Sequence, residues 1–273
     1  MFSEMLHNVR EKCPLIHNIT NYVTVNDCAN ILLACGASPI MADDLEDIKD
    51  ISPICGGLNI NIGTLNQHTI PSMYAAGKIA NQLGHPTLLD PVGAGASRIR
   101  TNTAIELVRQ IQFTVIRGNI SEIKAIALGN ESTKGVDADV SDSVTKDNLD
   151  AACSFAKNFA AKTGTVVAIT GAIDIVADTN KAYCIYNGTS AMSKITGTGC
   201  QLSAMTTAFI TANPGTPLEA TAAAVCAMGL CGEIAMERMS PKDGNSSYRN
   251  YIIDAVYNLT GDELENGARY EIR

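Results

Sequence analysis

The segment KITGTGC, residues 194–200, combines glycine, threonine and cysteine directly before a long apolar run that predicts a helix. Glycine lets another group approach the main chain closely, and the first turn of a helix leaves its amide hydrogens without intrahelical partners. These amides and the helix dipole favour bound anions. We therefore predict an anion-binding site formed by Gly197, Thr198 and Gly199, with Cys200 beside it.

Cys200 has two possible roles at such a site. A helix N-terminus favours the thiolate, which could act as a weak general base, whereas a neighbouring polyphosphate opposes ionisation. Alternatively, the cysteine is a small residue that packs against the substrate while the amides bind the anion. Both roles remain open from the sequence.

Polar or flexible residues follow several segments that predict strands. Alternation of strand and helix predicts a parallel sheet covered on both faces, and ligands bind at the carboxyl ends of such strands. The predicted parallel strands are 38–42, 57–63, 86–90, 113–119 and 165–170, and their ends carry Met41, Asn61, Asp90, Arg117, Asn119 and Thr170. We expect these side chains to meet at one edge of the sheet.

The remaining segments complete a prediction of one domain over residues 1–273, without internal repeats. Helical periodicity predicts helices over 24–36, 70–84, 101–111, from Ile120, 147–164, from Gly199, 217–239 and 247–258. The first of these has a capping-box-like pair, Thr24 and Asp27, at its start and Gly36 as its stop. Residues 129–148 predict a flexible loop, and 172–187 predict an antiparallel hairpin at the sheet edge.

Asn119 and Glu122 lie three residues apart at a predicted helix start. A carboxylate and an amide oxygen suit a hydrated Mg²⁺ ion, which takes few protein ligands. The same spacing is also typical of an N-terminal cap that satisfies the helix's own amides. Asp90 and the 194–200 segment favour the magnesium site over the cap alone.

The composition argues against several other functions. The net charge of −8 leaves no basic stripe for nucleic acid or a membrane surface, and we expect a cytoplasmic protein because no apolar stretch has signal or membrane-spanning length. No G-x-x-x-x-G-K-[ST] string occurs, and DPVGAGAS, residues 90–97, lacks the third glycine of a dinucleotide-binding loop.

Seven motifs occur in an order that resembles hydroxyethylthiazole kinase, an enzyme of thiamine salvage. They are HNITNYV (17–23), GASPIMA (36–42), LNINIGTL (58–65), LLDPVGAGAS (88–97), IRGNISEI (116–123), AITG (168–171) and KITGTGC (194–200). The resemblance implies a ribokinase-like three-layer α/β/α sandwich. It also implies transfer of the γ-phosphate of ATP to the primary hydroxyl of 5-(2-hydroxyethyl)-4-methylthiazole.

The resemblance further implies roles for individual residues. The thiazole would contact Asn21, Met41 and Gly197, ATP would contact Arg117 and Thr170, and Mg²⁺ and phosphate would lie near Asp90, Asn119 and Glu122. Members of the family form homotrimers with active sites between subunits. The wider ribokinase family usually has aspartate in the place of Cys200, whereas the thiazole kinases share the cysteine.

Two other classes of function remain as alternatives. A kinase of the same fold could act on another alcohol, such as hydroxymethylpyrimidine, or the fold could serve a nucleotide-dependent dehydratase. A binding module could sense the thiazole without turnover. Met41 and its apolar neighbours favour a small uncharged aromatic ligand over a sugar.

Arg117 follows an apolar strand and is expected to bind phosphate at the sheet edge. Arg117→Lys keeps the charge but loses the planar fork, so the apparent affinity for ATP should fall about tenfold, roughly 1.4 kcal/mol. Substrate-saturation kinetics in ATP would measure the change. An unaltered ATP affinity would remove Arg117 from the nucleotide site.

Overall fold

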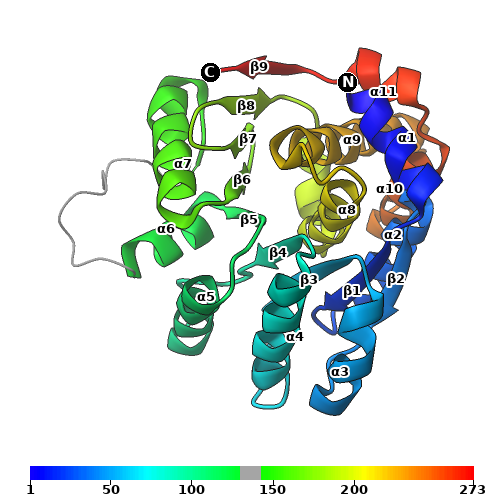
Figure 1. The fold of residues 1–273 in the computed structure, drawn as a ribbon. Coiled ribbons are helices and arrows are strands. Elements are labelled where there is room, and N and C mark those ends of the chain that lie inside the picture. The colour runs from blue at the N-terminus through cyan, green and yellow to red at the C-terminus, as the bar shows by residue number, and fades with distance from the viewer. Residues whose placement is uncertain (130–142) are drawn as a thin grey trace.

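Nine strands form one sheet in the computed structural model, which describes residues 1–129 and 143–273. They are β1 (Leu15–Ile19), β2 (Ser38–Met41), β3 (Gly57–Asn61), β4 (Thr87–Asp90), β5 (Val115–Asn119), β6 (Val166–Thr170), β7 (Asp174–Ala177), β8 (Ala182–Ile185) and β9 (Tyr270–Ile272). Their spatial order is β2-β1-β3-β4-β5-β6-β7-β8-β9 (Figure 1).

The strand order reverses direction between β1 and β3. The chain passes from β1 outward to the edge strand β2, then returns across β1 to form β3 on its other side. Strands from β2 to β6 in the spatial order are parallel, whereas β7, β8 and β9 add antiparallel pairs. Ligands of open parallel sheets bind outside the strand ends at such a reversal.

Helices cover both faces of the sheet (Figure 1). One layer holds α1 (Phe2–Lys12), α2 (Val25–Cys35), α8 (Thr198–Ala212), α9 (Pro217–Arg238), α10 (Asn245–Asn258) and α11 (Gly261–Gly267). The other holds α3 (Leu45–Ile54), α4 (Thr69–Leu83), α5 (Arg98–Gln110), α6 (Ile120–Gly129) and α7 (Leu149–Thr163). Short 3₁₀ helices span Lys146–Asn148 and Ser190–Lys194.

Consecutive strand residues face opposite helical layers because side chains alternate along a strand. Leu88 of β4 belongs to the apolar core beneath α8 and α9, whereas its neighbour Leu89 belongs to the core beneath α4 and α5. Val115 and Ile116 of β5 divide in the same way. These runs are apolar because both faces are buried, which confirms the predicted α/β/α sandwich.

Several elements differ from the sequence prediction. The helices α1, α3 and α11 and the strands β1 and β9 were not predicted, and β9 places one strand outside the predicted edge hairpin. Of the predicted loop 129–148, residues 130–142 lie outside the described parts of the chain, and Lys146–Asn148 form a 3₁₀ turn. The proposed capping box of α2 is wrong, because Thr24 makes no side-chain cap and its hydroxyl donates to Asn21 Oδ1 at 3.1 Å.

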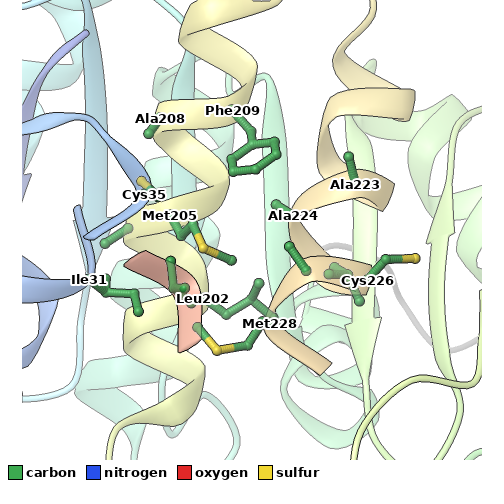
Figure 2. Packing of buried hydrophobic residues seen from close by; sticks show 14 of the residues in the cluster. Ile31, Cys35, Leu202, Met205, Ala208, Phe209, Ala223, Ala224, Cys226 and Met228 are labelled. Atoms are coloured by element: carbon green, nitrogen blue, oxygen red, sulfur yellow. The ribbon is translucent and has the colours of Figure 1, made fainter. Parts of the chain in front are cut away.

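The pair α8 and α9 forms the centre of one apolar core. Figure 2 shows Met205 and Phe209 of α8 between α2 and α9, with Ala224 of α9 close by. Of the helices in the described residues, only α9 is long and apolar enough to cross a membrane, and 78% of its apolar window is buried inside the protein. The N-terminal α1 packs on this layer against α8, α9 and α11.

Phe209 is fully buried in this core, so Phe209→Ala should lower the free energy of unfolding by roughly 3–5 kcal/mol. Leu33→Ala is the control, because Leu33 of α2 is 56% exposed and its truncation should change stability by no more than about 0.5 kcal/mol. Urea unfolding would measure both. Equal losses in the two variants would contradict this account of the core.

Candidate active site

The reversal between β1 and β3 brings two asparagine side chains together. Asn21 follows β1 and Asn61 ends β3, and Asn21 Nδ2 donates to Asn61 Oδ1 at 3.0 Å. Both amides also donate to the sulfur of Cys200, each at 3.2 Å. All three side chains are buried, so the start of α8 is joined to two strand ends without intervening solvent.

The thiol of Cys200 is held mainly in its neutral form. Burial is the largest cause that raises its pKa, the charge of Asp90 adds to it, and the bonds from Thr24, Asn21 and Asn61 oppose it. The sequence left open whether the helix start or a nearby negative charge would dominate. In the folded chain, burial and the carboxylate outweigh the donors.

Asp90 lies at the end of β4 with no exposed surface. Its Oδ2 accepts hydrogen bonds from Asn61 Nδ2 at 2.9 Å and Ser203 Oγ at 2.8 Å, and Arg117 Nη1 lies 3.5 Å away. Its Oδ1 has no hydrogen-bond partner among the described residues. Burial raises the pKa of Asp90 to about 6, although the Arg117 charge opposes this rise.

Arg117 contacts both Asp90 and Thr170, two residues that are expected to lie near the phosphates of ATP. Besides Asp90, its guanidinium donates from Nη2 to Thr170 Oγ1 at 2.6 Å. A Cβ atom on Gly199 would lie 2.7 Å from Arg117 Nη1, so glycine at this position leaves room for the guanidinium. The predicted nucleotide residues and the glycine-rich segment therefore meet.

Gly197 is the N-cap residue directly before α8 and lies in the left-handed region, with φ of 86°. A Cβ atom there would lie 2.4 Å from Thr24 Cγ2, so both conformation and packing require glycine. Thr198 and Gly199 form the first turn of the helix, where amide hydrogens lack intrahelical acceptors. The predicted helix start is confirmed, and anion binding by this segment stays a prediction.

Asn119 and Glu122 form the reciprocal cap that the sequence left as an alternative. The Glu122 amide donates to Asn119 Oδ1 at 2.8 Å, and the Asn119 amide donates to Glu122 Oε2 at 2.9 Å. The second carboxylate oxygen of Glu122 accepts from the Gly93 amide at 2.8 Å. The cap fixes Glu122 toward the turn after β4, and a metal-binding role for either side chain stays a prediction.

The residues around Asp90 fit a weakly ligated Mg²⁺ ion better than a tightly ligated metal. Within residues 1–129 and 143–273, no group of three or more His, Cys, Asp and Glu side chains could hold a metal ion. Mg²⁺ keeps several waters and binds through one or two carboxylates. The unpartnered, buried Asp90 Oδ1 offers one such ligand.

Met41 ends the edge strand β2 and is half-buried. The next carbonyl, that of Ala42, accepts a hydrogen bond from His17 Nε2 at 2.8 Å. Because a carbonyl can only accept, Nε2 carries the hydrogen, and the Ser52 hydroxyl donates to Nδ1 at 3.2 Å. The His17 side chain of β1 therefore holds the backbone that follows β2, in addition to the backbone pairing of the two strands.

Comparison with known proteins agrees with this geometry. The model of the hydroxyethylthiazole kinase family matches residues 6–262. The chain belongs to the hydroxyethylthiazole kinase family. A hydroxyethylthiazole kinase of Clostridium acetobutylicum is 67% identical over 99% of both chains, and one of Clostridium beijerinckii is 49% identical over 96% of this chain and 93% of its own.

Solved structures agree with the family assignment. A hydroxyethylthiazole kinase protein of Pyrococcus horikoshii OT3 is 36% identical, covers 100% of this chain and 98% of its own, and superposes with a TM-score of 0.88. A pyridoxal kinase of Staphylococcus aureus, 13% identical over 95% of this chain and 98% of its own, has a TM-score of 0.60 and shares the fold. The predicted family and the ribokinase-like fold are confirmed.

Three site residues of this hydroxyethylthiazole kinase family member were not predicted as such. Asn61 was recognised only as a strand end, yet it contacts both Asp90 and Cys200. Ser203, one turn after Cys200, contacts Asp90, and the helical spacing i, i+3 could have indicated it. Thr24 packs on Gly197, a contact for which the sequence offers no signal.

Because Asp90 ionises less readily in the folded chain, it contributes stability that is complete below about pH 4 and is lost as the pH rises through about 6. The stability of the wild type relative to Asp90→Asn should therefore fall by roughly 2–3 kcal/mol between about pH 4 and pH 7. Urea unfolding without Mg²⁺ would measure it. Burial also raises the pKa of Asp174 to about 7, but Asp174 is common to both proteins and cancels. A constant difference across this range would show that Asp90 keeps its ordinary pKa.

Proposed function

We propose that this protein transfers the γ-phosphoryl group of ATP to the primary hydroxyl of 5-(2-hydroxyethyl)-4-methylthiazole, a reaction of thiamine salvage. The observation that carries the proposal is the 67% identity, over 99% of both chains, to a hydroxyethylthiazole kinase. The glycine-rich helix start and the polar strand ends support it, because phosphoryl transfer depends on positioning and on neutralising charge.

We propose the following division of the site between the two substrates. Asn21, Met41 and Gly197 contact the thiazole, and Arg117 and Thr170 contact ATP. The amides at the start of α8, from Gly197 to Cys200, surround the transferred phosphoryl group, where they and the helix dipole stabilise its charge. The planar guanidinium of Arg117 supplies a second set of donors.

Asp90 would hold Mg²⁺ through its unpartnered Oδ1, with Glu122 and Asn119 as the other candidates. When bound, Mg²⁺ neutralises charge on the phosphate oxygens of ATP. The chain's own contribution is to keep Asp90 fixed, since Asn61, Ser203 and Arg117 all contact its other oxygen.

Of the two roles considered for Cys200, we propose packing against the acceptor alcohol. Its sulfur accepts hydrogen bonds from Asn21 and Asn61, and burial raises the pKa of its thiol. A neutral thiol whose lone pairs face two amides has little capacity to take the substrate proton. A loose transition state also places little demand on a base.

We propose that the protein acts as a cytoplasmic homotrimer with active sites between subunits. Exposed apolar side chains near the loop of Asn21 and the edge strand β2 support a self-association surface there. They are Tyr22, Val23 and Leu45, with exposed fractions of 65%, 63% and 41%. Light scattering of the purified protein would give its mass in solution, and a monomer at assay concentration would overturn this part of the proposal.

A coupled assay of ADP release tests the reaction. Thiazole alcohol, ATP and Mg²⁺ together should release ADP, whereas hydroxymethylpyrimidine in place of the thiazole should release far less. Release with the pyrimidine alone would favour a different alcohol as substrate. Binding of the thiazole without turnover would favour a sensor, the alternative from another functional class.

Two variants in the same assay separate the anion site from the thiol. Gly199→Val places a branched side chain against the Arg117 guanidinium and should abolish nearly all transfer. Cys200→Ala keeps the amides of the helix start and should lose less than the roughly 10²–10⁴-fold typical of a missing general base. A larger loss in Cys200→Ala would restore the base role.

A further inference from the structure

We propose that Asn61 is a positioning residue that holds Asp90 and Cys200 in a fixed relation to each other. The inference rests on the proposed function, because it assigns a task to a side chain within that site. Asn61 ends β3, where it is the register partner of Asp90 on β4, and it is 1% exposed. It bonds to Asp90 and to Cys200 with the same side-chain nitrogen.

The orientation of the Asn61 amide follows from its partners. The backbone amide of Gly63 donates to Asn61 Oδ1 at 2.9 Å, and a backbone N–H can only donate. Asn21 Nδ2 donates to the same oxygen at 3.0 Å. Asn61 must therefore present its NH₂ group to Asp90 and Cys200, and a flipped amide would face Gly63 with a second donor.

The two hydrogens of this NH₂ group match two acceptors. One donates to Asp90 Oδ2 at 2.9 Å and the other to Cys200 Sγ at 3.2 Å. Asn21 is oriented in the same way, because its Oδ1 accepts from the Val23 amide at 3.1 Å. The amide hydrogens of Asn61 are thus fully used in a buried setting where water does not compete.

Asp90 and Cys200 belong to different elements, β4 and α8, so their separation depends on side chains that join those elements. Ser203 joins α8 to Asp90 through its hydroxyl, which donates to Asp90 Oδ2 at 2.8 Å. Asn61 restrains the sulfur and the carboxylate at once. Since small misplacements at a phosphoryl-transfer site are costly to rate, loss of this restraint should lower turnover more than it weakens substrate binding.

Asn59 offers a matched control on the same strand and the same face. It is fully buried, and its Nδ2 donates to Asn18 Oδ1 at 3.0 Å, two residues away from the site. Asn59→Ala and Asn61→Ala both remove a buried amide and leave a partner without its donor. Asn61 makes four side-chain hydrogen bonds, whereas Asn59 makes one and its Oδ1 has no partner among the described residues, so Asn61→Ala should lower the unfolding midpoint more. Turnover is therefore compared at a temperature at which both variants are fully folded.

Turnover and binding should separate the two variants. Asn61→Ala should lower kcat by about 10²-fold, a larger factor than the loss of calorimetric affinity for the thiazole alcohol without ATP, which should also fall because Asn61 Oδ1 accepts from Asn21. Asn59→Ala should keep kcat within about threefold of the wild type. Asn61→Ser keeps one donor for the two acceptors, so its kcat should be intermediate. This variant also tests the proposal if Asn61→Ala does not fold.

A double-variant cycle with Cys200→Ala tests the connection itself. Because Asn61 contacts the sulfur, the combined loss of kcat should be smaller than the product of the two single losses. The combined shift in unfolding midpoint should likewise be smaller than the sum of the single shifts. This measurement can be made even if the protein has no kinase activity. Additive effects in both measurements would overturn the inference.

The outcomes distinguish the two proposals. A wild type that binds the thiazole but releases no ADP overturns the proposed function, whereas the midpoint cycle still tests the link from Asn61 to Cys200. An active wild type with equal kcat for Asn61→Ala and Asn59→Ala overturns the positioning role and leaves the proposed function intact.

Discussion

The carboxylate of Asp90 is the group on which the geometry of the site depends. One of its oxygens receives donors from three separate elements, through Asn61 of β3, Arg117 of β5 and Ser203 of α8. A buried carboxylate without such partners would be strongly unfavourable. If the ends of β3 and β5 or the start of α8 moved independently, the Asp90 carboxylate would lose hydrogen-bond donors while it remained buried.

The site occupies the place where the topology makes neighbours of strands that are distant in sequence. Because β3 returns across β1, Asn21 and Asn61 face each other, and both reach Cys200 at the start of α8. Arg117 of β5 and Thr170 of β6 bond to each other, and they continue the row of polar side chains along the carboxyl ends of the strands. Family membership and this layout agree, although they are independent observations.

The sequence was most informative where burial and periodicity coincide. The apolar runs around Leu88 and Val115 predicted strands correctly, and glycine-rich motifs identified the start of α8. It failed for β1, since His17 and Asn18 are polar although buried, and they bond to Ala42 and Asn59 on other strands or strand ends. Hydrophobic alternation cannot indicate such a strand, because tertiary hydrogen bonds replace apolar packing.

The candidate site was predictable as a set of residues but less so as an arrangement. Most of the predicted site residues lie near one another, yet the sequence could not show that Gly199 gives room to Arg117. Nor could it decide the ionisation of Cys200, which depends on the balance between burial and amide donors. Asn119 and Glu122 form a cap whose geometry the sequence offered only as one of two alternatives.

The packing of α1 has a consequence for how the chain acquires its structure. Helix α1 leaves the ribosome before the helices α8, α9 and α11 against which it packs, and the amino group of Met1 bonds to Glu265 at 3.0 Å. These partners are therefore synthesised long after α1. Such distant pairings delay folding and leave apolar surface uncovered meanwhile. The apolar side of α1, which includes Phe2 and Leu6, is buried only after α8, α9 and α11 have been synthesised.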